Sequence, residues 1–330
     1  MTKRATITAV GSYVPEDVLT NFDLEKMVNT NDEWIRARTG ISERRIVAED
    51  EATSDLSIAA IQNMLDEYEI DPETIDCIIV ATVTPDMFFP STGCLTQDAI
   101  GATNAWAFDL SGACSGFVYA IETGTRFVES GCYDRVLIVG ADTMSSITDY
   151  SDRSTCILFG DGAGAVLLEP TERDGYGILD SLVYTDGSGA RYLTMPGGGS
   201  KNPARHETVE KKLHYLRQDG RSVFKFAVNG MAEVSVEILE RNNLEGKDIA
   251  FFIPHQANKR IIDATARKMG LSEDQVVINI DKYANTTAAT IPLGLHEIIK
   301  DGRLQEGDYV VFSTFGAGFT WGATLLRWGK

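Results

Sequence analysis

The chain has 330 residues, 43% of them hydrophobic and 24% charged, and its net charge is −18. This composition is typical of a globular protein, and the length favours two domains or two fused halves over a single core. The negative charge disfavours general binding to nucleic acid or to an anionic membrane surface, because the long-range field repels polyanions.

Other features of the composition concern membranes, disulfides and metals. No apolar run approaches the roughly 18 residues needed to span a bilayer, and the apolar part of the N-terminus is far too short for a secretory signal. Five cysteines, an odd number without a C-x-x-C pair, argue against a disulfide framework or a zinc site. We therefore expect a cytoplasmic protein without a metal centre.

Apolar strand-like runs alternate with helical patterns along the chain. The strand-like runs are 77–84, 135–142, 164–170, 249–255 and 309–316. Helical spacing over 54–70 places Ile58, Ile61, Leu65 and Tyr68 on one face behind a cap at Thr53 or Ser54, and Met231, Val234 and Ile238 repeat this spacing later. Strands that are apolar throughout and separated by helices indicate a buried sheet covered by helices on both faces.

The two halves of the chain follow the same order. Each contains a helix, an acidic linker and an apolar strand ending in polar residues, with linkers YEIDPETID and RNNLEGKDI. This order predicts two similar α/β halves, residues 1–172 and 173–330. The segment 185–222 interrupts the alternation, and its Gly, Pro and charged residues predict a long surface excursion, a kind of segment that often carries function.

The stretch DLSGACSGF (109–117) places Cys114 between two glycines, at the hinge between a strand and a helix. The preceding AWAF is typical of a buried strand, and the following residues put Phe117, Ile121, Gly124 and Val128 on one helical face. Amides at a helix N-terminus favour an anion, so we expect a thiolate that is accessible near neutral pH. Gly112 and Gly116 allow a sharp turn and close packing, as at a nucleophile elbow.

An isolated cysteine in a Gly-rich crossing is more often a small buried hydrophobic residue. We adopt that interpretation for the other four cysteines, of which Cys77 and Cys156 lie in strand-like runs and Cys94 and Cys132 in helical or turn contexts.

Only four histidines could serve a thiolate. His206 and His214 lie in the charged excursion, where we expect them to be solvated, and His296 lies in a helical stretch and is structural or exposed. His255 closes the run 249–255 and opens a helix. Catalytic groups gather at the carboxyl ends of strands in α/β sheets, which makes His255 the candidate partner.

Two further segments carry candidate polar groups. Asn285 lies in a small-residue turn entering a helix, where asparagine commonly serves only as a turn or cap residue. Gly316, Ala317 and Gly318 can present backbone N–H groups to an oxyanion. The Gly-rich run 159–165 lacks the helix and the distant acidic residue of a dinucleotide fingerprint.

Together these pieces resemble the thiolase-fold condensing enzymes, most closely the beta-ketoacyl-acyl-carrier-protein synthase III family. The resemblance covers nearly the whole chain, in segments 31–44, 89–97, 108–120, 151–166, 223–228, 254–261, 283–292 and 315–322. It implies a thiolase-like α/β fold whose two halves form α/β/α/β/α layers, the first half carrying the nucleophilic cysteine and the second the histidine and asparagine.

The resemblance also implies the catalytic roles. Cys114 takes an acyl group from coenzyme A, His255 and Asn285 bind the malonyl thioester carbonyl, and the amides of Cys114 and Ala317 form the oxyanion hole. Ala317 stands where the family usually has the middle glycine of a triple-glycine run, a departure that is tolerable if its φ is negative. Two neutral donors stabilise an enolate oxygen without a charged group that quenches the carbanion. An asparagine where longer-chain enzymes carry a second histidine points to the chain-initiating type.

Contacts with substrates and partners follow from the same resemblance. Coenzyme A is expected to contact Trp34, Arg38, Arg153 and Asn258. An acidic acyl carrier protein is expected to dock on a local patch formed by Lys225, Gln256, Ala257, Asn258, Lys259 and Arg260. Phe89 aligns with a position that crosses a dimer interface to close the acyl pocket, so we expect a homodimer. The two thioesters are substrates, and we expect no cofactor, nucleic acid or membrane partner.

Several alternatives stay open. The order Cys…His…Asn also fits a papain-like hydrolase, although the residues around Cys114 and the strand–helix alternation do not suit that fold. Polyketide-type and hydroxymethylglutaryl-type synthases share the fold, but the latter carry a glutamate near the cysteine that 109–117 lacks. A non-catalytic acyl-CoA-binding module leaves the three polar residues without a purpose. We therefore expect an acyltransferase that starts fatty acid synthesis by decarboxylative condensation of an acyl-CoA primer, acetyl-CoA in the first instance, with malonyl-acyl-carrier-protein. Primer length and branching stay open.

Overall fold

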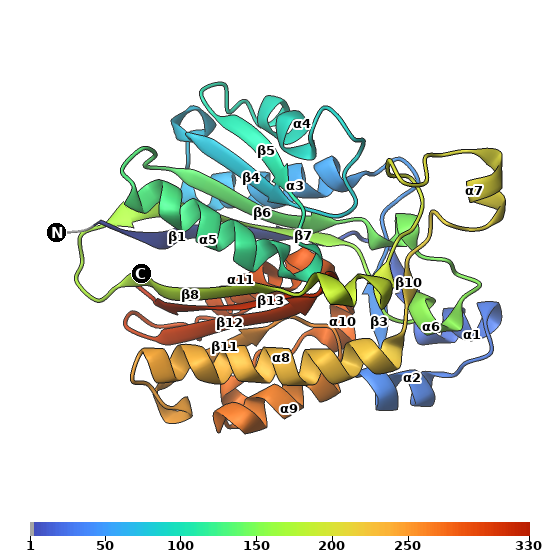
Figure 1. Ribbon diagram of the computed structural model, residues 1–330. Helices are drawn as coiled ribbons and strands as arrows, with labels where there is room; N and C mark the ends of the chain where they lie inside the picture. Colours follow the sequence, from blue (N-terminus) through green and yellow to red (C-terminus); the bar gives the residue numbers. More distant parts are fainter. Residues whose placement is uncertain (1–2) are drawn as a thin grey trace.

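The computed structural model describes residues 3–330, whose two large β-sheets face each other across a pair of helices (Figure 1). The first sheet has the strand order β1-β7-β6-β4-β5. Strand β4 is parallel to both β5 and β6, whereas β7 is antiparallel to both β6 and β1. The strands are β1 (Arg4–Tyr13), β4 (Cys77–Ala81), β5 (Trp106–Leu110), β6 (Val136–Asp142) and β7 (Gly162–Thr171).

The second sheet repeats this pattern with one strand fewer. Its order is β11-β12-β13-β8, formed by β8 (Gly177–Thr185), β11 (Phe251–Pro254), β12 (Tyr309–Gly316) and β13 (Thr320–Arg327). Strand β11 is parallel to β12, and β13 is antiparallel to both its neighbours. At the position that β5 occupies in the first sheet, a single parallel bridge joins Phe252 to Val276. The predicted similarity of the two halves is therefore confirmed, and the boundary at residue 172 stays a prediction that falls between β7 and β8.

Helices form the three other layers, which confirms the expected α/β/α/β/α arrangement (Figure 1). Helices α5 (Gly116–Glu129) and α11 (Thr290–Lys300) lie between the sheets. Helices α3 (Thr53–Tyr68) and α4 (Thr92–Ala99) cover the first sheet, and α8 (Gly220–Arg241) and α9 (Lys259–Met269) cover the second. Within residues 3–330, no helix combines the length and apolar character needed to cross a membrane.

The central layer shows why small residues are needed between two sheets. All four predicted face residues of α5, namely Phe117, Ile121, Gly124 and Val128, are buried. A Cβ at Gly124 would lie 2.8 Å from Cδ1 of Ile138, so only glycine lets the helix approach the first sheet this closely. Close packing of this kind makes the middle layer the rigid support for whatever lies at its ends.

The short elements gather at one end of the two sheets, at the right of Figure 1. They are β2 (Val18–Thr20), α1 (Asn21–Met27), α2 (Asp32–Thr39), β3 (Glu43–Arg45), α6 (Arg153–Cys156), β9 (Leu193–Thr194), α7 (His206–Glu210), β10 (Arg217–Gln218) and α10 (Ile280–Tyr283). Within the described part of the chain, 3-10 turns lie at Pro72–Thr74, Ala113–Ser115, Met144–Ile147, Gly187–Arg191, Gly246–Asp248, Glu273–Gln275 and Thr287–Ala289.

Three local predictions were wrong. The N-cap of α3 is Ala52, because the Thr53 hydroxyl donates to the Thr84 carbonyl instead of capping the helix. Cys156 lies in the short helix α6 and not in a strand. The AWAF run is only partly buried, since β5 is an edge strand and Trp106 is 43% exposed.

His296, which was expected to be either structural or exposed, has a structural role. The residue is buried, and its Nδ1 lies 2.6 Å from the Ser12 hydroxyl.

Candidate active site

Cys114, His255 and Asn285 line a single cavity of about 90 Å³ at the end of the sheets where the short elements gather. They come from the 3-10 turn after β5, the residue after β11 and the loop between α10 and α11. Their exposed fractions are only 7%, 1% and 6%. The structure therefore brings together three polar or nucleophilic groups, each from a different segment of the chain, in a site that excludes most water.

The turn that carries Cys114 is tight, but its glycines do not supply the unusual backbone conformation. Ala113 has the positive φ of 47°, whereas Gly112 and Gly116 have φ of −144° and −54°. The glycines instead permit close packing: a Cβ at Gly112 would lie 2.9 Å from the Gly116 Cα, and one at Gly116 would lie 3.2 Å from the Ala81 Cβ. The predicted close packing is confirmed, and the sharp turn belongs to Ala113.

The expectation of an accessible thiolate is wrong for the resting site. Burial, followed by the charge of the nearby Asp142 carboxylate, raises the pKa of the Cys114 thiol to about 12. Hydrogen bonds from the Cys114 backbone and from the Asn285 side chain act in the opposite direction but are smaller. Removal from water penalises the charged form, so the thiol keeps its proton until a substrate arrives.

His255 is held as a neutral imidazole. Its backbone amide donates to the Ser313 carbonyl of β12 at 2.8 Å, and its Nδ1 lies 2.8 Å from the Thr290 hydroxyl. Burial lowers the pKa of His255 to about 3. Among residues 3–330, the buried Nε2 has no hydrogen-bond partner, which leaves it available to a substrate atom in the cavity.

Asn285 is fixed by its backbone and by one side-chain atom. Its amide donates to the Leu158 carbonyl at 3.0 Å, and its carbonyl accepts from the Gly160 amide at 3.1 Å. The side-chain Oδ1 accepts from the Thr287 amide at 2.9 Å, so the side-chain nitrogen is the group left for the cavity. The neighbours Ala284 and Thr287 have positive φ of 57° and 51°, a backbone strain that is typical of functional sites.

The Gly316–Gly318 turn lies directly against the cysteine. A Cβ at Gly316 would lie 3.0 Å from the backbone nitrogen of Cys114, and the Thr314 hydroxyl donates to the Cys114 carbonyl at 2.8 Å. The positive φ of the turn, 139°, falls on Gly318 and not on Ala317. Ala317 therefore has no positive φ, which was the condition for an alanine at this position.

A second cavity, of about 150 Å³, begins at Cys114 and Ala317 and runs between apolar side chains. These side chains are Val83, Met144, Ile147, Phe159, Leu193, Met195 and Leu216. Three of them come from the segment predicted to be a surface excursion, which instead packs partly inward, with Leu216 buried. The apolar character of these three residues within a charged segment is the feature of the sequence that could have indicated the inward packing. Phe89 lines neither cavity of its own chain, because it lies on an exposed loop.

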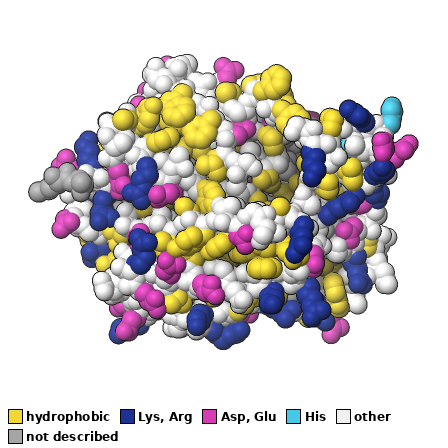
Figure 2. Space-filling model, in the orientation of Figure 1, with side chains coloured by type: hydrophobic (Ala, Val, Ile, Leu, Met, Phe, Trp, Pro, Cys, Tyr) yellow, Lys and Arg dark blue, Asp and Glu magenta, His cyan; other side chains and the backbone are white. Residues whose placement is uncertain are grey.

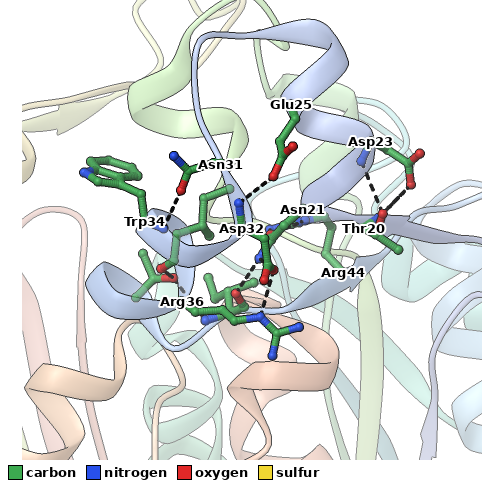
Figure 3. Close-up of polar contacts among 12 residues, drawn as sticks. Thr20, Asn21, Asp23, Glu25, Asn31, Asp32, Trp34, Arg36 and Arg44 are labelled. Carbon is green, nitrogen blue, oxygen red and sulfur yellow. Dashed lines mark hydrogen bonds and ion pairs between the residues drawn. The ribbon is translucent and has the colours of Figure 1, made fainter.

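The residues expected to contact coenzyme A are neighbours on three elements. The Arg153 guanidinium of α6 lies 5.1 Å from the centre of the Trp34 ring on α2, and Asn258, the N-cap of α9, donates to the Arg38 carbonyl at 3.0 Å. The Trp34 amide donates to the Asn31 side chain at 2.8 Å, which starts α2 (Figure 3). The structure thus brings Trp34, Arg38, Arg153 and Asn258 to one surface, next to the cavity that Asn258 lines.

Buried Arg44 lies beside Asn21, in the network that leads to α2 (Figure 3). Its guanidinium donates to the Asn21 side chain at 3.1 Å and 3.0 Å and to the Ile157 carbonyl at 3.0 Å. Asn21 in turn donates to Asp32 of α2 at 2.9 Å. Burial lowers the pKa of Arg44 to about 10, so the group still carries its charge at neutral pH. This network ties α2 and α6 to the first helix, although no motif in the sequence pointed to it.

The residues expected to meet the carrier protein are of three kinds: exposed, exposed but ion-paired, and held inside the protein. Lys225 and Arg260 are exposed, and the Arg260 guanidinium lies 4.8 Å from the ring of Phe224, which lines the cavity. Lys259 is exposed but pairs with Asp263 at 2.9 Å. Figure 2 shows Lys and Arg side chains along this lower right edge of the molecule.

Two members of that set are not on the outer surface. Gln256 is only 1% exposed, and its side-chain nitrogen donates to the Pro254 and Val277 carbonyls at 2.8 Å and 3.1 Å. The expectation that Gln256 contacts the carrier protein is therefore wrong, because its polar groups are already used inside the protein. Ala257 lines the cavity.

The five cysteines are unpaired, and among residues 3–330 no three His, Cys, Asp or Glu side chains gather as a metal ion would need. Of these cysteines, only Cys114 lines the cavity that His255 and Asn285 share. A single thiol with two amide or imidazole nitrogens is suited to acyl transfer through a thioester.

Comparison with known proteins points to the same chemistry. Two family models match the chain, 3-oxoacyl-(acyl-carrier-protein) synthase III over residues 108–187 and its C-terminal counterpart over residues 239–328. A beta-ketoacyl-acyl-carrier-protein synthase III of Koribacter versatilis is 54% identical, over 99% of this chain and 98% of the relative. The 3-oxoacyl-(acyl-carrier-protein) synthase III from Aquifex aeolicus, known from its crystal structure, is 45% identical, with a TM-score of 0.90 over 98% of this chain and 100% of that chain.

A priming beta-ketosynthase of a polyketide pathway has a similar fold, with a TM-score of 0.91 over 100% of this chain and 98% of that chain, but is only 33% identical. The polyketide-type alternative is not favoured, because relatives that are 54% and 55% identical over nearly the whole chain are named beta-ketoacyl-acyl-carrier-protein synthase III. The chain belongs to the beta-ketoacyl-acyl-carrier-protein synthase III family and has its thiolase-like fold.

Proposed function

We propose that Cys114, His255 and Asn285 carry out the reaction of this family in the present chain. That reaction joins an acyl-CoA primer to malonyl-acyl-carrier-protein and initiates fatty acid synthesis, with 3-ketoacyl-acyl-carrier-protein, CO₂ and coenzyme A as products. The observation that carries the proposal is the convergence of the three residues on one nearly closed cavity next to the Gly316–Gly318 turn.

In the first step, the Cys114 sulfur attacks the carbonyl carbon of the acyl-CoA. The new C–S bond forms as the thiol proton leaves, and the C–S bond to coenzyme A breaks as its thiolate takes up a proton, so the transfer is neutral overall. The oxygen of the tetrahedral intermediate is negative, and we assign its stabilisation to the Cys114 and Ala317 amides. The apolar cavity of about 150 Å³ beyond these two residues would then hold the acyl chain.

In the second step, the malonyl thioester loses CO₂ and the electron pair of the broken C–C bond passes to the enolate oxygen. The Nε2–H group of His255 and the side-chain N–H₂ of Asn285 are the donors that we assign to this oxygen. Each well-aimed donor is typically worth roughly 3–4 kcal/mol in such a site. Because burial keeps His255 neutral, the site offers the carbanion no acidic imidazolium to quench it.

The carbanion then attacks the thioester carbonyl of acyl-Cys114. A C–C bond forms, the C–S bond to the enzyme breaks, and the Cys114 thiolate that is released takes up a proton. The raised pKa of Cys114 favours this last protonation and returns the site to its resting state.

For coenzyme A, we assign the binding of the adenine and phosphates to Trp34, Arg38, Arg153 and Asn258. The aromatic face of Trp34 with the Arg153 guanidinium beside it supports a stacking site for a purine. For the acidic carrier protein, we assign docking to Lys225, Lys259 and Arg260. A local basic patch is needed there, because the chain as a whole carries a net charge of −18.

We also propose a homodimer formed along the edge of the first sheet. Strand β5 is the last strand of that sheet, and the nearby loop carries Met87, Phe88 and Phe89, of which Phe88 and Phe89 are 80% and 85% exposed. An uncovered edge strand with exposed aromatic side chains is normally paired or covered. Phe89 of one protomer would close the acyl pocket of the other. Sedimentation should give twice the mass of one chain, and Trp106→Arg should give monomers.

The free cysteines are consistent with a reducing cytoplasm, where we place the reaction. The proposed function is tested by two half-reactions. Incubation with acetyl-CoA alone should add one acetyl group, and peptide mass should map it to Cys114. Addition of malonyl-acyl-carrier-protein should then release CO₂ and form the ketone.

Cys114→Ala should abolish acetylation and ketone formation, whereas Cys132→Ala, a matched change at an exposed cysteine outside the cavity, should leave them intact. Label at Cys94 or Cys156, or no label, contradicts the proposal.

A further inference from the structure

A buried carboxylate, Asp142, lies behind the active site at the end of β6 and is completely enclosed. Its Oδ1 accepts from the Thr82 hydroxyl at 2.9 Å, from the Val83 amide at 2.8 Å and from the Thr84 amide and hydroxyl at 3.2 Å and 3.0 Å. Its Oδ2 accepts from the Thr287 hydroxyl. Oδ1 is thus held by the end of β4, and Oδ2 holds a loop from the other half of the chain.

Thr287 is the residue through which Asn285, one of the two proposed enolate donors, is held. Its amide donates to Oδ1 of Asn285 at 2.9 Å, which turns the side-chain nitrogen of Asn285 toward the cavity. The Thr287 carbonyl lies 3.0 Å from the Thr290 hydroxyl, whose single proton is needed by Nδ1 of His255 at 2.8 Å if Nε2 is to carry the imidazole proton. The backbone of Thr287 therefore orients Asn285 and not His255.

The backbone of Thr287 needs an external hold. Its φ of 51° lies in the left-handed region, which is unfavourable for a β-branched residue such as threonine. Such a conformation persists only where the surroundings impose it. The hydrogen bond to a buried carboxylate supplies that constraint, because hydrogen bonds to charged groups are stronger than neutral ones.

We infer that Asp142 is a positioning residue that acts through Thr287 to aim Asn285 at the enolate oxygen. The inference rests on the proposed function, because it takes the side chain of Asn285 to be a donor in decarboxylation. Asp142 itself does not touch the substrate. It ties the C-terminal ends of β4 and β6 in the first half to the donor loop in the second, so the two halves are held in register at the reacting centre.

The next residue along the chain provides a matched control. Thr286 is also buried in this loop, and within residues 3–330 its hydroxyl has no hydrogen-bond partner. Thr286→Val and Thr287→Val thus remove the same hydroxyl group from adjacent buried positions. Only the second change breaks the contact with Asp142, so a difference between the two variants reports that contact and not the loss of a buried hydroxyl in general.

The experiment measures two rates in each variant: acetylation of Cys114 by acetyl-CoA, and CO₂ release from malonyl-acyl-carrier-protein by the acetylated enzyme. Thr287→Val should slow CO₂ release by roughly 10- to 100-fold, the range expected when a catalytic group is displaced slightly. Acetylation should stay within about threefold of wild type, because the amides of Cys114 and Ala317 are untouched. Thr287→Ser, which keeps the hydroxyl, should restore CO₂ release, and Thr286→Val should match wild type.

A second variant covers the case in which Thr287→Val does not fold. Asp142→Asn keeps the shape and one acceptor oxygen for the Thr82–Thr84 donors, but its N–H₂ cannot accept from Thr287. It should slow CO₂ release by at least about tenfold, while acetylation stays unchanged or becomes faster because a negative charge near Cys114 is removed.

The inference is overturned if Thr287→Val and Asp142→Asn release CO₂ at the wild-type rate, if both rates fall together, or if Thr286→Val loses as much as Thr287→Val. Wild-type enzyme that acetylates Cys114 but releases no CO₂ overturns the proposed function, and the inference with it.

Discussion

The Thr290 hydroxyl lies 2.8 Å from Nδ1 of His255 and 3.0 Å from the carbonyl oxygen of Thr287. The hydroxyl has one proton and can donate it to only one of these atoms. If it donates to Nδ1, the imidazole proton is on Nε2, which is the tautomer that can donate to an enolate oxygen. Thr290 therefore decides whether His255 acts as a donor in the cavity.

We expect Thr290→Val to slow CO₂ release roughly two- to tenfold, since a typical hydrogen bond contributes about 0.5–1.5 kcal/mol. Histidine-selective ¹⁵N NMR should show a shift from the Nε2–H tautomer toward the other, because Nδ1 has lost its donor. Thr290→Ser keeps the hydroxyl and should retain both the tautomer and the rate. An unchanged ¹⁵N spectrum in Thr290→Val rules out this role for Thr290.

The raised pKa of Cys114 makes a prediction about its reactivity. Only the thiolate is alkylated, and burial raises the pKa of this thiol to about 12. The rate of alkylation by iodoacetamide at Cys114 should therefore continue to rise with pH through about pH 9. Peptide mass spectrometry resolves Cys114 from the exposed Cys132, which monitors the reagent in the same sample. A plateau below pH 8 would instead indicate a thiolate stabilised by the helix N-terminus.

The layered fold could be predicted from the sequence because its signals are local. The runs 77–84, 135–142 and 309–316 contain β4, β6 and β12, and the face of α5 follows directly from the spacing of Phe117 and Val128. The edge position of β5 could not be read in this way. Trp106 is apolar like a buried residue, and only the strand order of the assembled sheet reveals that it lies on an edge strand and stays 43% exposed.

A sequence motif located the candidate site, whereas the pKa values of its groups depend on how far distant segments bury them. The helix N-terminus at Cys114 is visible in the sequence, but the burial that raises its pKa comes from distant segments such as the Gly316–Gly318 turn and Leu193. Gln256 shows the opposite error, since a residue next to the functional His255 was given a function although its side chain is used inside the protein. The Asp142–Thr287 contact joins residues 145 positions apart and has no local signature.

The lowered pKa of His255 predicts how stability depends on pH. A histidine in the unfolded chain titrates near 6.5, whereas burial lowers the pKa of His255 to about 3. Between these values the unfolded state binds a proton that the folded state does not, so the free energy of unfolding falls as the pH falls. His255 should account for a loss of about 2 kcal/mol between pH 7 and pH 5.

Urea unfolding of His255→Gln at both pH values isolates this contribution. The variant should lose about 2 kcal/mol less than wild type over the same interval. Burial also lowers the pKa of His296, but that residue is present in both proteins and its effect cancels in the comparison. Equal losses in the two proteins contradict a neutral, buried His255.

Reversal of one charge beside the cavity tests whether Lys225, Lys259 and Arg260 form the docking patch for the carrier protein. Arg260→Glu should raise KM for malonyl-acyl-carrier-protein roughly fivefold at low salt, and leave KM for acetyl-CoA unchanged, because an acidic partner is steered by the local charge. The effect should shrink as salt screens it. Arg327→Glu is a matched control, since Arg327 also stacks on an aromatic ring, that of Tyr176 at 4.5 Å, but ends β13 and lines neither cavity of the active site. Equal increases for both substrates, or in both variants, count against the patch.

Asn285→Asp tests the division of labour between the two half-reactions. One carboxylate oxygen can still accept from the Thr287 amide, so the loop and its packing should survive, while the other oxygen replaces the N–H₂ that faces the cavity. A negative group then lies where the enolate charge must develop, and CO₂ release should fall by roughly 10²–10³, the loss expected for one oxyanion donor. Acetylation of Cys114 does not use this donor and should persist, so the same sample contains its own control. If acetylation and CO₂ release fall together, Asn285 has a structural role; if CO₂ release is unimpaired, the enolate does not depend on Asn285 and the proposed second step is wrong.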